Sequence, residues 1–292
     1  MVIVRIKGGL GNQLFQYSAG YALAKRLKTE LYLDDSFYPS QSLRAYKLSF
    51  FMVSGKKYTE KLPWFIRLIR SRYINKLLRI INKRVIRFGK WTYLLETRSN
   101  IVEEFFSVNN KNVYIDGYYQ SERYFIQHKT ELIKEFAYRC ENSEQFQHIK
   151  KMMCSSESVA IHIRRGDFLK AQFDKNSNHY LLEKSYYSNA INLIKNKVAS
   201  PVFFCFSDEI EWAKENLKSG NNIYFISLSE ENNDIKELIL MSYCKHIITA
   251  NSTFSWWSSW LNNYENALHL CPSKRYGNLF LIPSDWIKID ID

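Results

Sequence analysis

The chain lacks the features that mark several large classes of protein. Its five cysteines form no CxxC pair, which argues against a zinc ribbon or a disulfide framework. No apolar run reaches the roughly 18 residues that a membrane-spanning helix needs. A strand-like segment starts at residue 2 and reaches a glycine turn by Gly8, so we expect no secretory signal. We therefore expect a cytoplasmic protein with reduced thiols, whose membrane contact is at most peripheral, at the inner face of the plasma membrane.

Two motifs that would indicate a cofactor or a metal are also missing. The glycine turn at residues 8–13 (GGLGNQ) does not have the GxGxxG spacing of a dinucleotide fold, although Asp34 or Asp35 could be forced into the role of its ribose-binding acid. The DxD motif with which many sugar transferases hold a divalent cation occurs only as Asp290 and Asp292, at the last residues. We expect no bound cofactor and no metal.

Acidic residues are nearly absent from one segment. The net charge is +12, and residues 56–90 contain 12 basic residues against Glu60 alone, so the rest of the chain is almost neutral. This distribution argues against binding of nucleic acid over the whole surface, and we expect no nucleic-acid partner. At about 100° per residue, six cations fall in one narrow sector of a helix. They are Arg72, Lys76, Arg79, Lys83, Arg87 and Lys90.

The spacing of these cations predicts a basic amphipathic helical insertion at about 56–90. Three interpretations stay open: a basic face that is merely solvated, a helix that lies on an anionic membrane surface, or a platform for an anionic, lipid-linked acceptor.

Hydrophobic patterning indicates two α/β lobes. Strand-like segments at 2–7, 31–34 and 113–116 belong to an N-terminal lobe, which we place at residues 1–150, with the boundary inside the polar segment 138–156. In the second lobe, residues 151–275, strand-like and helical segments alternate. This alternation predicts right-handed βαβ crossovers and a parallel sheet that is covered on both faces.

Three polar clusters follow predicted strands of the second lobe. They are Arg164-Arg165-Gly166-Asp167, Ser207-Asp208 and Asn251-Ser252-Thr253. Carboxyl ends of parallel strands meet at one edge of a sheet, so these side chains should face one crevice. Two guanidinium groups, hydroxyl groups and the amides of a helix N-terminus predict a diphosphate site. The alternative is a structural loop in which Arg164 or Arg165 pairs with Asp167.

Several of these motifs together resemble glycosyltransferase family 11, the α-1,2-fucosyltransferases of bacterial type. The motifs are GGLGNQLFQ at 8–16, GYYQSE at 117–122, HIRRGD at 162–167, FSD at 206–208, LMS at 240–242 and NSTFSWW at 251–257. The HxRR part is shared with α-1,6- and protein O-fucosyltransferases.

The resemblance implies an α/β, GT-B-like fold of two Rossmann-type lobes, with the donor site in the C-terminal lobe, a cleft between the lobes, and a tail at 276–292 that packs back on the N-terminal lobe. It implies GDP-β-L-fucose as donor and no metal. Transfer with inversion would give an α-1,2 link to a galactose-containing acceptor in a surface glycan such as O-antigen or lipopolysaccharide. Two other readings remain, an α-1,6-type fucosyltransferase and a non-catalytic GDP-sugar or polyanion-binding protein.

The resemblance also implies residue roles. Arg165 would bind the β-phosphate, Ser252 and Thr253 would hold the diphosphate, and Asn12 would face the sugar. Glu237 stands where the family generally carries Asp, and its acceptor oxygens could read the N–H donors of guanine. The full donor-binding set is Arg164, Arg165, Ser207, Asp208, Glu237, Asn251, Ser252 and Thr253.

Two further sets complete the candidate site. We place acceptor contacts at Tyr118, Gln120 and Glu122, in the aromatic and polar loop after strand 113–116. The acceptor hydroxyl also needs a base, for which Asp167 and His162 are the candidates by position.

Overall fold

The chain divides into two compact units, Met1–Arg139 and Cys140–Asp292. The computed structural model describes residues 1–40, 42–97, 101–139, 143–171, 180–217, 222–228, 232–273 and 282–291. The division falls inside the polar segment at 138–156. Helix α6 (Glu144–Cys154) therefore lies in the second unit, whereas a boundary after residue 150 would have assigned most of it to the first.

The first unit contains a six-stranded sheet in the order β3-β2-β1-β6-β5-β4. Its strands are β1 (Val2–Arg5), β2 (Leu31–Asp34), β3 (Lys56–Lys57), β4 (Val85–Phe88), β5 (Trp91–Leu95) and β6 (Asn112–Asp116). All neighbouring strands are parallel except β4 and β5, which form an antiparallel hairpin. The carboxyl ends of β1, β2 and β6 therefore meet at one edge, where ligands of such sheets bind.

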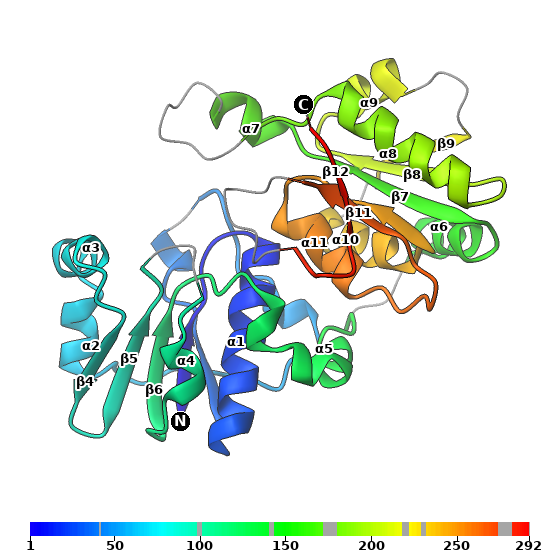
Figure 1. The fold of residues 1–292 in the computed structure, drawn as a ribbon. Helices are drawn as coiled ribbons and strands as arrows, with labels where there is room; N and C mark the ends of the chain where they lie inside the picture. The colour runs from blue at the N-terminus through cyan, green and yellow to red at the C-terminus, as the bar shows by residue number, and fades with distance from the viewer. Residues whose placement is uncertain are drawn as a thin grey trace. The chain divides into compact units, whose positions relative to one another are not determined.

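Helix α1 (Leu10–Leu27) follows β1 through the glycine turn (Figure 1). Gly8 has a φ of 82°, a conformation that glycine adopts without steric cost, and Gly9 precedes the first turn of the helix. The other helices of this unit are α2 (Trp64–Ile69), α3 (Arg72–Ile80), α4 (Glu104–Ser107) and α5 (Lys129–Glu135). Short 3₁₀ helices lie at Tyr38–Ser40, Leu48–Phe50, Glu122–Tyr124 and Ile126–His128.

The predicted single basic helix at 72–90 is wrong. Helix α3 ends at Ile80, Asn82 has a φ of 53°, and Val85–Phe88 is strand β4. A left-handed Asn is a common helix terminator, and the β-branched Val85 and Ile86 fit a pleated strand better than a helix. Only Arg72, Lys76 and Arg79 of the six cations lie on one helix.

The second unit contains a six-stranded, fully parallel sheet in the order β12-β11-β10-β7-β8-β9. Its strands are β7 (Ser158–Ile163), β8 (Val202–Ser207), β9 (Ile223–Ile226), β10 (His246–Ile248), β11 (His269–Pro272) and β12 (Ile287–Ile289). Besides α6, its helices are α7 (Gly166–Ala171), α8 (Lys184–Lys197), α9 (Ile210–Leu217), α10 (Asn233–Tyr243) and α11 (Thr253–Trp260). The alternation of strands and helices that the sequence predicts is confirmed from β7 to β11, whereas α7 and β12 were not predicted.

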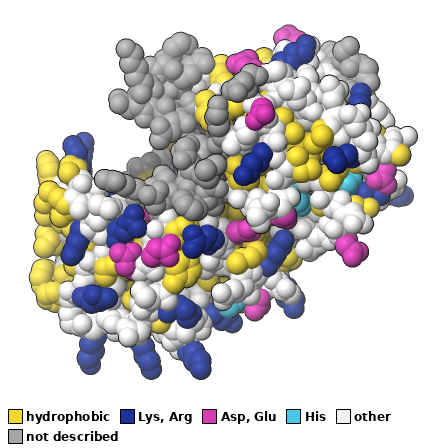
Figure 2. All heavy atoms as spheres, in the orientation of Figure 1, with side chains coloured by type: hydrophobic (Ala, Val, Ile, Leu, Met, Phe, Trp, Pro, Cys, Tyr) yellow, Lys and Arg dark blue, Asp and Glu magenta, His cyan; other side chains and the backbone are white. Residues whose placement is uncertain are grey.

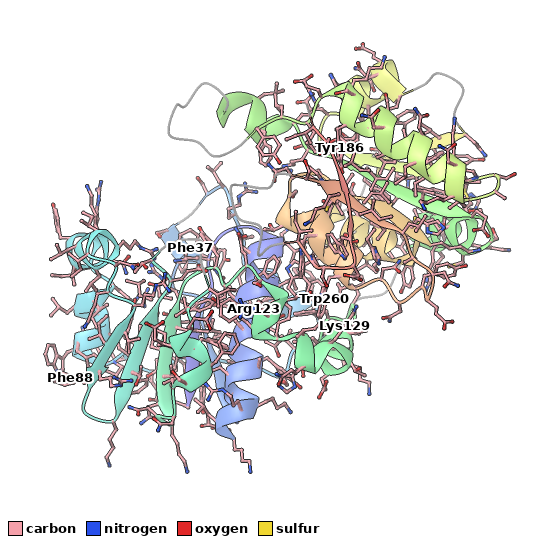
Figure 3. All side chains as sticks on the ribbon, in the orientation of Figure 1. Phe37, Phe88, Arg123, Lys129, Tyr186 and Trp260 are labelled. Atoms are coloured by element: carbon pink, nitrogen blue, oxygen red, sulfur yellow. The ribbon has the colours of Figure 1, made fainter. Side chains whose placement is uncertain are left out.

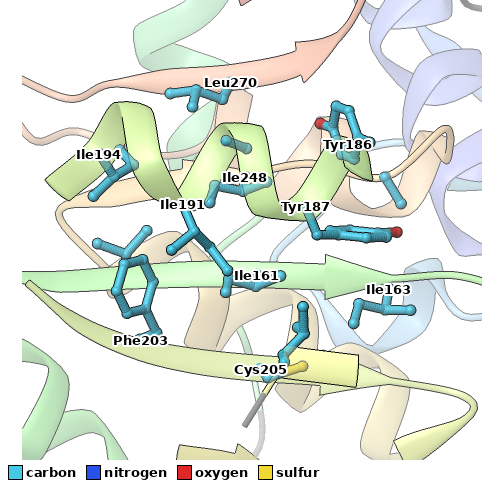
Figure 4. Packing of buried hydrophobic residues seen from close by; sticks show 14 of the residues in the cluster. Ile161, Ile163, Tyr186, Tyr187, Ile191, Ile194, Phe203, Cys205, Ile248 and Leu270 are labelled. Atoms are coloured by element: carbon cyan, nitrogen blue, oxygen red, sulfur yellow. The ribbon is translucent and has the colours of Figure 1, made fainter. Parts of the chain in front are cut away.

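Strand β7 lies at the centre of this sheet, and all six of its residues are buried. Helix α8 covers it with Tyr187 and Ile191, which pack over Ile161 and the neighbouring β8 (Figure 4). A strand buried on both faces explains why residues 159–163 read as a continuous apolar run with His162 as the exception.

The tail does not form part of the first unit. Ile287–Ile289 is the edge strand of the second sheet, and Ser273 donates its N–H to the Ile289 carbonyl at 2.8 Å. Ile287, Ile289 and Ile291 pack against the core of the second unit. The expectation that residues 276–292 pack back on the N-terminal lobe stays a prediction; in the described part of this tail, residues 282–291, β12 belongs to the second sheet. Among the described helices, none combines the length and the apolar character that crossing a bilayer requires.

Candidate functional site

Asp208 organises the turn between β7 and α7. Its Oδ1 accepts the Arg165 N–H at 2.9 Å, its Oδ2 accepts the Gly166 N–H at 3.2 Å, and Arg164 Nη1 lies 3.0 Å from Oδ2. Strand β8 pairs in register with β7 up to Ser207, which places Asp208 directly beside this turn. The carboxylate of Asp208, a residue predicted to contact the donor, braces the loop that carries the arginines. The alternative of an ion-paired loop named Asp167, whose side chain lies outside the described set; the ion-pair partner that the structure shows for Arg164 is Asp208.

Arg165 is held differently from Arg164. Its Cζ lies 4.0 Å from the centre of the Trp212 ring on α9, a cation–π contact that sequence reasoning missed. Its Nη1 is buried, and no described residue accepts a hydrogen bond from it. Buried guanidinium donors are normally satisfied, so this geometry suits an anionic ligand at Arg165.

The N-terminus of α11 lies at the end of β10, the strand next to β7. Ser252 Oγ accepts the Phe254 N–H at 3.2 Å and caps the helix, and Ser255 Oγ accepts the Ala250 N–H at 3.1 Å. These bonds order the turn that presents Thr253, and the helix dipole adds partial positive charge there. The Ser252 hydroxyl thus acts as a helix cap, a role that the sequence assignment did not include.

Ser207 and Asn251, two other residues predicted to bind the sugar donor, lie where a strand leads into the next helix. Ser207 Oγ accepts the Glu209 N–H at 2.9 Å, at the start of α9. Asn251 is buried in the turn before α11.

His162 is only 5% exposed, and its ring centre lies 5.3 Å from that of Phe254. The His162 ring, on β7, therefore lies against the first turn of α11. Asp167 is the second residue of α7, and its side chain lies outside the described set.

Glu237 lies on the second turn of α10. Burial, together with the neighbouring carboxylates Asp234 and Asp208, raises the pKa of Glu237 to about 7. Asp208, which contributes to this rise, is the carboxylate that braces the turn of Arg164 and Arg165. A carboxyl group in this environment gains a proton easily and is stabilised as an anion only when donors or cations face it.

In the first unit, the structure brings Asn12 and the predicted acceptor loop together. Gln120 Nε2 donates to Asn12 Oδ1 at 2.7 Å, and the Tyr118 ring, 40% exposed, carries Lys7 Nζ at 5.2 Å from its centre. Glu122 starts the 3₁₀ helix that follows. An exposed ring beside amide groups is typical of a surface that binds a sugar.

A buried charged cluster beneath this loop was not predicted. Asp116 accepts hydrogen bonds from Lys7 Nζ at 2.7 Å, Arg5 Nη1 at 2.9 Å and the Tyr93 hydroxyl at 2.8 Å. Burial opposes ionisation of Asp116, but Lys7 and Arg5 hold its pKa well below the usual range. The cluster therefore fixes Lys7 where it supports Tyr118. The alternation of basic and apolar residues up to Lys7, with Arg5 in β1 and Lys7 after it, was the available signal in the sequence.

Asp34 is not available to a dinucleotide. Its Oδ2 lies 2.7 Å from Arg70 Nη1 and accepts the Tyr114 hydroxyl at 2.5 Å, and the residue is buried. A carboxylate bonded in this way cannot also bind the ribose hydroxyls of a nucleotide, which argues against the dinucleotide interpretation for this residue.

Two α/β units, one built on a mostly parallel sheet and one on a fully parallel sheet, are the architecture of the GT-B fold. The NodZ α-1,6-fucosyltransferase, solved after soaking with GDP-fucose, has this fold, with a TM-score of 0.57 at 13% identity over 89% of this chain and 91% of that chain. The predicted α/β, GT-B-like fold class is confirmed.

The chain belongs to glycosyl transferase family 11, whose profile matches residues 1–285. It is 31% identical over 303 residues to an Escherichia coli α-1,2-colitosyltransferase, covering 99% of both chains. It is 32% identical over 301 residues to the E. coli O-antigen biosynthesis glycosyltransferase WbnK, covering 97% of this chain and 99% of that one. A mouse galactoside 2-α-L-fucosyltransferase is 21% identical over 267 residues, covering 89% of this chain and 64% of that protein.

Proposed function

We propose that the protein transfers L-fucose from GDP-β-L-fucose to the 2-hydroxyl of a β-galactoside in a surface glycan, with inversion and without a metal. The observation that carries the proposal is the Arg165 guanidinium, which is held against Trp212 with a buried donor that no described residue satisfies. The family and the O-antigen and galactoside relatives support the reaction class and the kind of acceptor.

In this proposal the leaving GDP is stabilised by charge that is already in place. Fucose departs through an oxocarbenium-like transition state, and negative charge grows on the diphosphate. Arg165 and the amides at the start of α11 would receive that charge. Arg164, neutralised by Asp208, would hold the turn in shape rather than bind phosphate directly. A preorganised donor of this kind is typically worth about 3 kcal/mol of barrier.

Glu237 would accept hydrogen bonds from the guanine N1–H and amino group. Two adjacent donors on one edge of the base match two carboxylate oxygens. Glu is one methylene longer than the Asp generally found in the family, and the second turn of α10 would have to accommodate that length.

The acceptor would lie on the first unit, with its sugar against Tyr118 and its hydroxyls near Asn12 and Gln120. Asp167 would take the proton of the attacking hydroxyl. His162, buried against Phe254, would position the first turn of α11 instead of acting as the base.

A second donor deserves equal testing, because one relative of matching length is a colitosyltransferase. Colitose is fucose without its 3-hydroxyl. A site built to hydrogen-bond that hydroxyl would discriminate strongly against GDP-colitose, whereas an apolar site would accept both donors. The comparison of the two donors therefore reports on the sugar pocket directly.

The experiment is transfer to an array of galactosides with each donor, followed by NMR assignment of the product linkage. We expect an α-1,2-fucosyl product. Transfer of colitose alone would reassign the donor, and an α-1,6 product would reassign the linkage. Binding of GDP without transfer to any galactoside would indicate a non-catalytic GDP-sugar-binding protein.

We predict that transfer does not depend on a divalent cation, because arginine and helix amides would neutralise the diphosphate. Activity should be unchanged after dialysis against EDTA and on addition of Mn²⁺ or Mg²⁺. The control is a metal-dependent glycosyltransferase treated in the same buffers. Activity that disappears in EDTA and returns with Mn²⁺ would contradict the prediction.

A further inference from the structure

The outer edge of the first unit exposes a continuous set of large apolar side chains. They are Trp64, Leu68, Tyr73, Leu77, Ile80, Ile81 and Phe88, each between 48% and 84% exposed, and we call them the apolar edge. Figure 2 shows hydrophobic side chains gathered along this side of the unit, over α2, α3 and β4. Monomeric proteins rarely expose apolar patches of this extent without a binding role.

Buried neighbouring side chains fix the side chains of the apolar edge in their exposed positions. Helix α2 is anchored by Phe65, Ile66 and Ile69, which are buried against the sheet, and this leaves Trp64 and Leu68 on its other face. Phe88 stacks on Phe65 at 4.9 Å between ring centres and points away from the sheet edge (Figure 3). The edge is therefore a built part of the fold.

Helix α3 adds a stripe of its own. None of its residues is buried, and Tyr73, Leu77 and Ile80 recur at the four- and three-residue spacing of one helix face. Arg79 faces the protein, because its Nη1 donates to the Glu96 carbonyl at 2.6 Å. An amphipathic helix whose apolar face lies in water is energetically unfavourable unless another surface covers that face.

Cations surround the apolar edge, and residues 61–91 contain no acidic residue. Seven of the basic side chains in this stretch are exposed: Lys61, Arg67, Arg72, Lys76, Lys83, Arg87 and Lys90. Trp and Tyr favour the depth of lipid headgroups, and long basic side chains can reach phosphates while their stems lie on apolar surface. An exposed edge with this composition matches a lipid surface better than a protein groove.

We propose that the apolar edge and its surrounding cations bind the surface of a membrane rich in anionic lipid headgroups. The apolar side chains would enter the interface while the cations contact phosphates, so the protein would lie on the bilayer without crossing it. This inference is independent of the donor and acceptor assigned above.

The test is flotation of the full-length protein with phosphatidylcholine vesicles, prepared with and without phosphatidylglycerol. We expect binding to the anionic vesicles only, weakening as salt is raised because the charges are exposed. Lys76→Glu/Lys83→Glu should weaken binding by about fivefold for each cation lost, and thus at least about 25-fold in total. Lys111→Glu/Lys134→Glu makes the same change in net charge at exposed sites outside the edge and should bind like the wild type.

A second double variant tests the contribution of the apolar side chains to vesicle binding. Leu77→Gln/Ile80→Gln keeps good helix formers in α3 and should remove most of the binding that survives at high salt. Trp64 fluorescence should shift to shorter wavelength on vesicle binding, and Trp64→Phe should abolish that shift. Transfer to a soluble galactoside should be unchanged in both double variants, which separates this proposal from the catalytic one.

Three results would overturn the proposal. The first is no flotation of the wild type with anionic vesicles at low salt. The second is equal binding by Lys76→Glu/Lys83→Glu and by the control. The third is a wild-type dimer in sedimentation velocity that Leu77→Gln/Ile80→Gln dissociates, which would assign the apolar edge to a second copy of the chain.

Discussion

Replacing Arg165 with alanine should lower the rate of transfer by about a hundredfold or more, the usual loss when one preorganised donor to a developing anion is removed. The effect should fall mainly on kcat, because the guanidinium counters charge that grows in the transition state. Arg165→Lys keeps the charge but loses the planar fork and the stacking on Trp212, so we expect an intermediate loss. The measurement is steady-state transfer from GDP-fucose.

Two controls show whether the loss is catalytic. Arg123→Ala removes an exposed arginine whose Nη2 lies 3.7 Å from Glu103, and it should not change the rate. Loss of the Trp212 contact should cost Arg165→Ala about 1 kcal/mol of stability, so the protein should still melt cooperatively, a few degrees below the wild type. Near wild-type turnover by the alanine variant would refute the donor site at this turn.

GDP should bind about tenfold more weakly for each pH unit below about 7, because guanine would be recognised by ionised Glu237. The free protein holds a proton on this carboxyl up to about pH 7, and that proton must leave before both oxygens accept hydrogen bonds. Affinity is therefore full above pH 7 and falls as pH decreases. Calorimetric titration with GDP between about pH 6 and about pH 8 measures this slope.

Glu237→Gln isolates the carboxyl from other titrations. The terminal phosphate of GDP also titrates at about pH 6 and changes the affinity of both proteins with pH. The contribution of Glu237 is therefore the slope of log affinity against pH in the wild type minus the same slope in the variant. The variant should bind GDP about tenfold to a hundredfold more weakly at pH 8, the value of a charged hydrogen bond. Identical slopes for the two proteins would remove Glu237 from guanine recognition.

The same carboxyl predicts a stability change without ligand. Its pKa rises from 4.5 to about 7 on folding, so the folded state holds this proton more tightly than the unfolded chain. The resulting stabilisation is present below about pH 4.5 and is lost as pH rises through 7. We therefore expect the difference in melting temperature, wild type minus Glu237→Gln, to decrease as the pH is raised from about 5 to about 8.

Local patterns predicted the second unit well. A run such as residues 158–163 fits a buried parallel strand better than another element. Polar turns that follow parallel strands lie at one edge of the sheet, whatever the side-chain packing. The turns at Arg164, Ser207 and Asn251 were located in this way. The motifs also predicted the family, because their order along the chain is specific.

Residues 72–90 show where local patterns fail. Cations at three- and four-residue spacing satisfy a helical wheel, but residues 85–88 pair with β5, and that pairing competes with the helix. Asn82 and the β-branched Val85 and Ile86 were weak local signals for this outcome. Strand β12 shows the same limit, since no local pattern predicted that Ile287–Ile289 pairs with β11.

By itself, the sequence determined that the arginine turn of residues 164–167 ends a buried strand, that it belongs with the turn before α11, and that acidic residues are excluded from 61–91. Only the tertiary structure decided which side chains of that site already have partners within the protein. Asp208 is used by two backbone donors and by Arg164, whereas Arg165 rests on Trp212 with a donor that no described residue satisfies. The physical reason is that buried polar groups take partners from strands and helices far away in the chain, and no local pattern records those pairings.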